Sequence, residues 1–149
     1  MKKIVNKKAR FDYELLEKVE AGIVLTGTEV KSVKQGQISL KEGFVRIDDN
    51  GEVWLVNANV HPYKFADNKN YEPTRSRKLL LKKTEILGLL KKIEGKNLTL
   101  IPTAIYTRKN KIKVEIAIGR GKKKWDKRRA IKEREGKREV RKAMKEKNR

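Results

Sequence analysis

The alternation of apolar and polar residues along the chain predicts strands in its first half. Between Phe11 and Leu25, apolar side chains recur at alternate positions with polar or small residues between most of them, which predicts one long strand or two joined strands. The segment 44–56 shows strand-like runs on both sides of Asn50-Gly51, a pair that readily adopts the positive φ values of a tight turn. We therefore expect a β-hairpin there.

Two segments have the features of helices instead. Residues 28–34 begin with Thr28, a candidate cap, and Gly36 follows where a helix of two turns would stop. Residues 83–93 place their apolar side chains on one helical face, and Gly95 marks the end of this longer helix. The side chains of that face are Ile86, Leu87, Leu90 and Ile93.

A second hairpin is predicted further along the chain. Strands at 98–107 and 112–118 flank the turn Arg108–Lys111. Several antiparallel strands of this length predict an all-β dominated fold, a small antiparallel β-barrel of the OB type with flanking helices. Barrels of that type commonly bind oligonucleotides on a strand face and its loops.

The composition changes abruptly at Gly119-Arg120-Gly121. Residues 120–149 contain 16 Lys or Arg against 5 Asp or Glu, a net charge of +11, and no continuous apolar stripe. Such a segment buries too little apolar surface to order itself, although its helix-favouring residues can form a helix once phosphates neutralise the repulsion. We therefore divide the chain into a barrel with helices, 1–119, and a basic tail, 120–149, which is disordered alone and helical when bound to RNA.

The net charge indicates the class of partner. The 149 residues contain 40 Lys and Arg against 19 Asp and Glu, a net charge of +21. Such a chain repels itself unless a polyanion is bound. Adaptation to heat explains a high content of charged residues but not this imbalance, so nucleic acid is the favoured partner.

Candidate catalytic residues are sparse. The chain has no Cys, and His61 is its single histidine, which excludes a His or Cys metal site and a Cys nucleophile. No P-loop, dinucleotide or Gly-x-Ser-x-Gly motif is present, and Asp48 and Asp49 lie at a hairpin turn, where a structural role is favoured. We expect no enzyme activity, cofactor, metal or small-molecule substrate. The sequence has no signal-peptide or membrane-spanning apolar run, so we expect a cytoplasmic protein without membrane contact.

Several separated motifs stand in an order and spacing similar to those of one family. They are Asn6-Lys7-Lys8-Ala9-Arg10, Glu20-Ala21-Gly22-Ile23, Gly27-Thr28-Glu29-Val30-Lys31-Ser32, Asn57-Ala58-Asn59-Val60, Glu72-Pro73-Thr74-Arg75-Ser76-Arg77-Lys78-Leu79-Leu80-Leu81, Gly121-Lys122-Lys123, Asp126-Lys127-Arg128 and Ile131-Lys132-Glu133-Arg134. Over nearly the whole chain, this series resembles SsrA-binding protein, also called small protein B. The resemblance implies a non-catalytic protein with an OB-type barrel that binds the tRNA-like domain of transfer-messenger RNA (tmRNA). It also implies delivery of that RNA to stalled ribosomes for trans-translation, with the tail in the messenger channel and decoding site on small-subunit ribosomal RNA.

The resemblance also implies roles for particular residues. Glu20, Leu80 and Lys113 match positions implicated in the family's RNA contacts. From the residues alone, Glu20 accepts from a base edge or a 2′-OH, orients a neighbouring Lys, or is an ordinary exposed carboxylate. Leu80 either packs on an unstacked base or belongs to the core, and Lys113 either binds a phosphate or is simply solvated.

Basic segments extend the expected RNA surface. A groove that follows the RNA backbone is expected to be lined by Asn6, Lys7, Lys8 and Arg10 and extended by Arg75, Arg77 and Lys78, with solubilising surface charge as the alternative.

The tail contains the residues expected to act on the ribosome, which are Gly121, Lys122, Lys123, Trp125, Asp126, Lys127 and Arg128. Gly121 permits a bend out of the barrel, and Asp126 can cap a helix. Trp125 offers a face for stacking on a base, where the family often has His or Tyr. A general single-strand RNA-binding or ribosomal protein and an RNA-processing enzyme are the alternatives.

Overall fold

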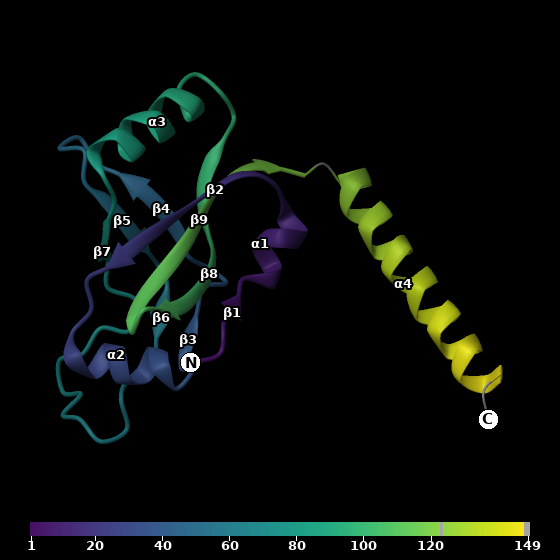
Figure 1. The fold of residues 1–149 in the computed structure, drawn as a ribbon, viewed down its shortest axis with the longest axis horizontal. Coiled ribbons are helices and arrows are strands. Elements are labelled where there is room, and N and C mark those ends of the chain that lie inside the picture. Colours follow the sequence, from purple (N-terminus) through teal and green to yellow (C-terminus); the bar gives the residue numbers. More distant parts are fainter. Residues whose placement is uncertain (123, 148–149) are drawn as a thin grey trace.

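The computed structural model describes residues 1–122 and 124–147, without the side chains of residues 124–126, 130, 143, 146 and 147. Figure 1 shows a strand-rich body flanked by short helices, and a long C-terminal helix that points away from it. The strands are β1 (Ile4–Val5), β2 (Tyr13–Ile23), β3 (Ile38–Ser39), β4 (Phe44–Ile47), β5 (Val53–Val56), β6 (Asn59–Val60), β7 (Arg77–Leu80), β8 (Thr99–Arg108) and β9 (Lys111–Gly121). The helices are α1 (Lys7–Asp12), α2 (Gly27–Lys34), α3 (Lys83–Ile93) and α4 (Lys124–Lys147).

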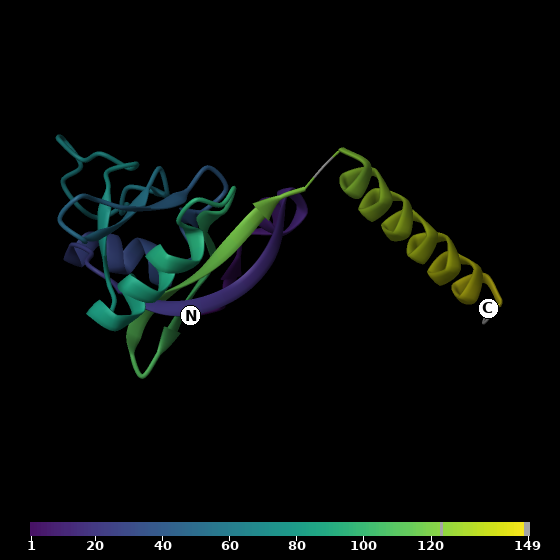
Figure 2. The ribbon, with the colours of Figure 1, turned by 90° about the horizontal axis from the view of Figure 1, so that it is seen from above.

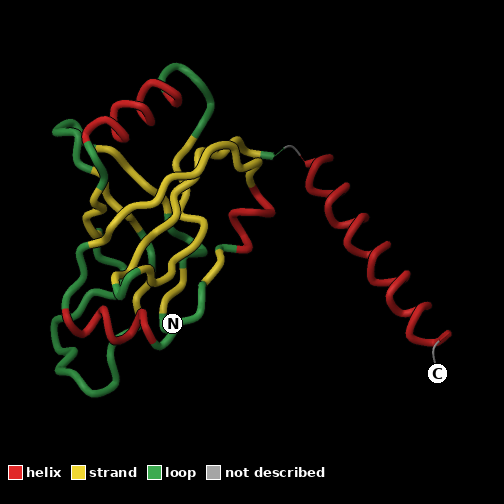
Figure 3. The backbone as a smooth tube through the Cα atoms, in the orientation of Figure 1, coloured by secondary structure: helices red, strands yellow, loops and turns green. Residues whose placement is uncertain are grey.

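The larger sheet curls until its two ends meet. Its strands follow the order β1-β8-β4-β5-β7-β2-β9, and β9 also pairs with β8, so the order returns toward its beginning. All of these pairings are antiparallel, and Figure 3 shows the strands wrapping around one another. The seam between β4 and β8 is short, with Val45 opposite Leu100 as its residue pair. The fold is therefore a strand-rich antiparallel sheet that nearly closes into a barrel, which confirms the coarse fold prediction.

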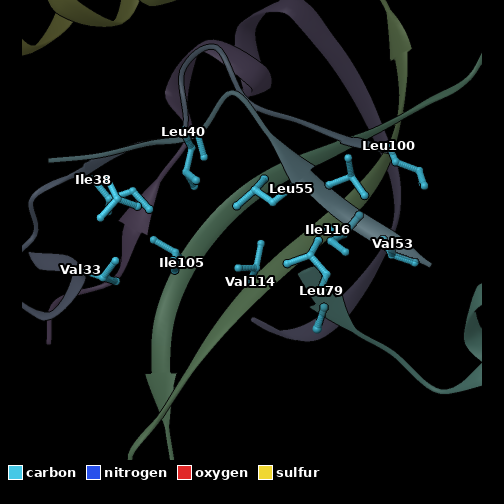
Figure 4. Close-up of a cluster of buried hydrophobic side chains, with 14 of the residues drawn as sticks. Val33, Ile38, Leu40, Val53, Leu55, Leu79, Leu100, Ile105, Val114 and Ile116 are labelled. Carbon is cyan, nitrogen blue, oxygen red and sulfur yellow. The ribbon is translucent and has the colours of Figure 1, made fainter. Parts of the chain in front are cut away.

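The inward side of the strands forms one hydrophobic core. On β9, Val114, Ile116 and Ile118 are buried and point inward, as their alternation predicts. Figure 4 shows Val114 and Ile116 meeting side chains from β5, β7 and β8 and from the segment after α2. Each fully buried aliphatic side chain contributes about 1.5–3 kcal/mol, so this cluster is the main favourable term in folding.

Helix α1 stands where the alternation predicts the start of a strand. Asn6 caps this helix, because its Oδ1 accepts a 3.2 Å hydrogen bond from the Ala9 N–H. Ala9 is buried, and α1 lies against β2 and β8. Phe11 therefore belongs to the helix, and the predicted strand begins only at Tyr13.

The first predicted hairpin is formed by β4 and β5. Gly51 has a φ of 77°, as the turn requires. The Asp48 carboxylate accepts hydrogen bonds from the N–H groups of Asn50 (3.0 Å) and Glu52 (2.9 Å) and from the Trp54 indole (2.9 Å). These bonds confirm the structural role predicted for Asp48.

The second predicted hairpin is formed by β8 and β9. Lys109 (φ 51°) and Asn110 (φ 63°) make a two-residue turn with both residues in the left-handed region, the geometry that matches the twist of paired strands. This turn lies within the predicted segment 108–111. Lys109 at its tip, with Arg108 and Lys111 on either side, places cationic side chains at one end of the barrel.

Helix α2 has nearly the predicted bounds but a different cap. Thr26 Oγ1 accepts from the Glu29 N–H (3.3 Å), and Glu29 Oε1 accepts from the Thr26 N–H (3.0 Å), which makes a reciprocal capping box. Thr28 lies inside the helix instead.

Helix α3 has the predicted bounds, but its buried face differs. Leu89 is the side chain that is buried, whereas Leu87 and Leu90 are exposed. Ile86 and Ile93 pack against the core as predicted. The inward face is therefore displaced by part of a turn.

The barrel extends past its predicted end. Arg120 pairs with Glu14, and Gly121 pairs with Tyr13, so β9 continues beyond Gly119. Figure 2 shows α4 as a separate rod beyond this strand. Within residues 1–122 and 124–147, no helix is both long and apolar enough to cross a membrane.

Candidate nucleic-acid interface

Leu80 and Lys113, predicted from distant parts of the sequence, lie on either side of one glycine. Gly22 of β2 is opposite Leu80 on β7 and opposite Lys113 on β9. Glu20 stands two positions before Gly22 and therefore shares its face of the strand, whereas Ala21 between them is buried in the barrel. We call the outer face formed by Glu20, Gly22, Leu80 and Lys113 the Gly22 surface.

The absence of a side chain at Gly22 gives this surface its shape. A Cβ at that position would lie 3.3 Å from the Leu80 Cβ, so Leu80 leans over the glycine. Leu80 is about half exposed (53 %), which excludes it from the core and leaves an apolar surface free for a ligand. A cleft of about 360 Å³ adjoins it, lined among others by Val30 and Lys34 of α2 and by Lys111 at the hairpin tip.

Glu20 holds other side chains at the edge of this surface. Its carboxylate accepts a 2.5 Å hydrogen bond from the Tyr106 hydroxyl and forms a 2.8 Å ion pair with Arg108. Burial and the hydrogen bond to Glu20 raise the pKa of Tyr106 to about 12, so the hydroxyl keeps its proton and remains a donor. Glu20 thus orients an arginine and a tyrosine, where the sequence suggested a lysine.

A second cationic region lies between α1 and the start of the tail. A cleft of about 530 Å³ is lined by Lys7, Lys8, Arg10, Phe11, Lys122 and Arg134. Lys8 also forms an exposed 3.0 Å ion pair with Glu42. The concentration of positive charge around an aromatic ring is the combination that single-stranded nucleic acid requires.

Asn6 does not line this cationic region, although the sequence places it there. Its side chain is buried, caps α1, and donates to the backbone oxygens of Leu40 (3.1 Å) and Pro102 (2.8 Å). Each of these bonds satisfies a buried polar group, which explains why an asparagine stands at this point of a basic segment.

Arg77 is also buried, although the sequence predicts it on the RNA groove. Its side chain is fully buried, and its guanidinium is committed to Glu29 and to backbone oxygens, including those of Ala58 (2.9 Å) and Pro73 (3.0 Å). Arg75 is one-third exposed and is bound to the other oxygen of Glu29. Lys78 remains half exposed, beside Glu52 at 3.3 Å.

Comparison with known proteins assigns the chain to one family. The family model described as SmpB protein matches residues 3–146. The chain belongs to the SmpB family. The SsrA-binding protein of Sulfurihydrogenibium sp. (strain YO3AOP1) is 54 % identical over 94 % of this chain and 91 % of its own length, and that of Persephonella marina is 51 % identical over the same shares.

A solved SmpB structure has the same fold. It is described as "tmRNA-SmpB: a journey to the center of the bacterial ribosome", is 43 % identical, and superposes with a TM-score of 0.68. The match covers 87 % of this chain and 94 % of the solved one. At that identity and coverage, the two chains share the SmpB fold.

The first residues of the predicted tail of this SmpB chain are still part of the barrel or bonded to it. Gly121 is the last residue of β9, and the Lys122 N–H donates to Asp12 O at 2.9 Å. Lys127 forms a 3.1 Å ion pair with Asp12 and lies 5.8 Å from the centre of the Phe11 ring, whereas Arg128 is exposed. Lys123 and the side chains of Trp125 and Asp126 lie outside the described residues; α4 begins at Lys124, so Asp126 is in its first turn rather than at the cap.

Sequence reasoning assigned no role to several residues at or beside the Gly22 surface. Gly22, Lys34, Tyr106 and Arg108 were not singled out, although Gly22 interrupts a strand pattern, a usual sign of close approach by another group. Tyr106 faces Lys113 across the β8–β9 hairpin. Extending the register outward from the 109–110 turn would have found that pair.

Proposed function

We propose that this chain binds tmRNA through the Gly22 surface and that its tail acts at the decoding site of a stalled ribosome. SmpB proteins bind tmRNA and rescue ribosomes in trans-translation without being enzymes, and membership of the family carries this function to the chain. The assignment of the barrel to the tRNA-like domain, and of the tail to the messenger channel and small-subunit ribosomal RNA, is the finer part of the proposal.

One observation supports the proposed RNA surface above the others. Three strands far apart in the chain bring Glu20, Leu80 and Lys113 to one outer face, two of them against the same glycine. An exposed leucine beside a lysine has little value for stability. It suits an RNA whose unpaired base or sugar packs on the leucine while a phosphate meets the ammonium group.

The cations around this surface set the electrostatics of binding. Lys34, Lys111 and Lys113 line the cleft, and Arg108 is held beside it by Glu20. Each contact with a phosphate releases condensed counterions, so affinity should fall steeply as salt rises. Specificity for a folded RNA should come from the apolar and hydrogen-bonding groups that salt does not screen.

The domain division and the tail belong to the same proposal. We infer an OB-type barrel that ends at Gly121 and a tail that is helical once bound to RNA and disordered alone, in the cytoplasm where ribosomes work. The charge of the tail supports this inference, because a net +11 within 120–149 opposes helix formation until phosphates neutralise it.

The experiment that tests the function compares tmRNA with an unrelated structured RNA of equal length. Affinity of the purified chain for both is measured across a range of salt concentrations. We expect a preference for tmRNA of about a hundredfold, equivalent to about 2.7 kcal/mol, that persists at high salt. Affinities that fall together would instead indicate a general single-strand RNA-binding or ribosomal protein, whose binding rests on charge alone.

A further inference from the structure

The segment between β6 and β7 carries an aromatic pair, one ring of which is exposed, that the proposed function does not use. Phe65 is 77 % exposed, the highest value among the large hydrophobic side chains of the described residues. Its ring meets that of Tyr63 edge to face, with 5.6 Å between the centroids and 69° between the planes. Tyr63 thereby fixes the orientation of Phe65 while the outer face of Phe65 stays open to solvent.

Two lysines surround this pair. Lys31 of α2 places its Nζ 5.3 Å from the centre of the Tyr63 ring, and Lys64 places its Nζ 5.7 Å from the centre of the Phe65 ring. An ammonium group within about 6 Å of a ring is attracted to its face. The same groups are within reach of the phosphates on either side of a base stacked on Phe65.

The aromatic pair stands on an ordered segment. Tyr63 O accepts hydrogen bonds from the Asn68 side-chain amide (2.9 Å) and the Ala66 N–H (3.2 Å), which closes a tight turn around Phe65. Further along, the Tyr71 hydroxyl donates to Val60 O at 2.8 Å. A ring held on a fixed turn loses less conformational entropy on binding than a ring on a loose loop.

Helix α2 connects this segment with the Gly22 surface. Val30 and Lys34 line the cleft at Gly22, whereas the ammonium group of Lys31, between them in the sequence, lies over the Tyr63 ring. Figure 1 shows the segment after β6 passing below α2, at the end of the barrel that also carries the β8–β9 turn. An RNA strand bound at the Gly22 surface therefore has a second contact region around the helix.

We propose that Phe65, oriented by Tyr63, is a stacking platform for an unpaired nucleobase of the RNA. The exposure of Phe65, its edge-to-face partner, the flanking lysines and the net charge of the chain fit a base with its phosphates. An acidic or apolar protein surface would not use the open ring face in this way. The proposal rests on the proposed function, and the base belongs either to tmRNA or to ribosomal RNA.

The test uses the full chain with Phe65→Ala, Phe65→Trp and the control Leu87→Ala. Leu87 is also exposed but lies on α3, away from this segment. Affinity for free tmRNA, and of the tmRNA complex for the ribosome, is measured for each variant. We expect Phe65→Ala to weaken one of the two on the order of tenfold, Phe65→Trp to retain it, and Leu87→Ala to change neither.

A photoreactive phenylalanine at position 65 identifies the contacted group. A cross-link to an unpaired nucleotide supports the proposal, and the RNA that carries it distinguishes tmRNA from ribosomal RNA. A cross-link to a ribosomal protein, or unchanged affinities for Phe65→Ala, would overturn it. If either of these results appears while the unsubstituted chain still prefers tmRNA over the unrelated structured RNA, only the stacking platform fails. If the unsubstituted chain shows no preference between the two RNAs, the proposed function itself fails.

Discussion

The Nε of Arg77 donates a 2.7 Å hydrogen bond to Oε2 of Glu29, and both side chains are fully buried. Glu29 belongs to α2 and Arg77 to β7, so this bond joins the helix to the barrel. Arg75 and the Tyr71 hydroxyl contact the same carboxylate. The four side chains fasten the segment that carries Phe65 to the helix that lines the Gly22 surface.

Substitution Glu29→Gln should destabilise the fold by about 3 kcal/mol, because it leaves the buried guanidinium of Arg77 without its counter-charge. Urea unfolding at neutral pH measures the loss. Glu42→Gln is the matched control, since Glu42 forms an exposed ion pair with Lys8 and should change stability by less than about 0.5 kcal/mol. Equal small effects for both variants would show that the buried pair contributes no more than a surface pair.

The same carboxylate should make stability depend on pH. Burial alone would raise the pKa of Glu29, but hydrogen bonds from Arg75, the Thr26 N–H and Arg77 outweigh it and lower the pKa from 4.5 to about 2. Because the pKa is lower in the folded state, ionised Glu29 stabilises the fold above pH 4.5, and this contribution is lost as pH falls through about 2. The difference in unfolding free energy between the native chain and Glu29→Gln should shrink over that interval.

The long strand β2 and the two hairpins were predictable because their information is local, whereas the short strands β1, β3, β6 and β7 were not predicted. Alternation decides which side chains of β9 face the core, and the residues at 109–110 tolerate the positive φ of their turn. Helix α1 was missed because Phe11 and Tyr13 fit the strand period that continues in β2. Only the contacts of Asn6 with residues 40 and 102 reveal that the chain turns there.

Charge along a sequence does not tell a buried cation from an exposed one. Arg75, Arg77 and Lys78 look alike in the sequence. In the structure, Arg75 and Arg77 both bind Glu29, but only Arg77 is fully buried, and Lys78 is partly exposed beside Glu52. The residue that decides among them lies on α2, more than forty positions earlier. Conversely, Lys113 was assigned to a polar strand face by alternation, and that placement is correct.

Lys113→Ala and Leu80→Ala should weaken tmRNA binding in different ways. Loss of one phosphate contact at Lys113 should lower the slope of log affinity against log salt by about 1. Leu80→Ala should lower affinity by about 1 kcal/mol with the slope unchanged, because the lost contact is apolar. Salt titrations of both variants check this distinction.

Lys132→Ala is a control for the slope, since Lys132 is exposed on α4 and lies away from the Gly22 surface. Its loss should leave the binding of the isolated tRNA-like domain unaltered. Identical slopes of log affinity against log salt for the native chain and Lys113→Ala would show that Lys113 does not contact a phosphate. A slope altered by Leu80→Ala would mean that this variant disturbs the cations around it.

Removal of the tail after Lys122 should leave the unfolding transition of the barrel unchanged. The described contacts of α4 with the barrel centre on Lys127, which meets Asp12 and Phe11 at the surface. Truncation after Gly119 should instead be destabilising, because it removes the β9 residues paired with Tyr13 and Glu14. Thermal unfolding of the two truncated chains distinguishes these cases, and equal transitions would show that the end of β9 contributes nothing.

The triple substitution of Trp125, Lys127 and Arg128 by Ala should separate the two halves of the proposed function. The Gly22 surface is formed by β2, β7 and β9, so the affinity for tmRNA should stay within about threefold, equivalent to about 0.7 kcal/mol. Ribosome rescue should be abolished, because the variant removes two phosphate-neutralising side chains and a stacking ring from the segment proposed to enter the decoding site. Filter binding and tagging of a stalled nascent peptide measure the two properties on the same preparation. Parallel losses in both would mean that the tail and the barrel bind tmRNA as one unit, and would contradict the division of labour.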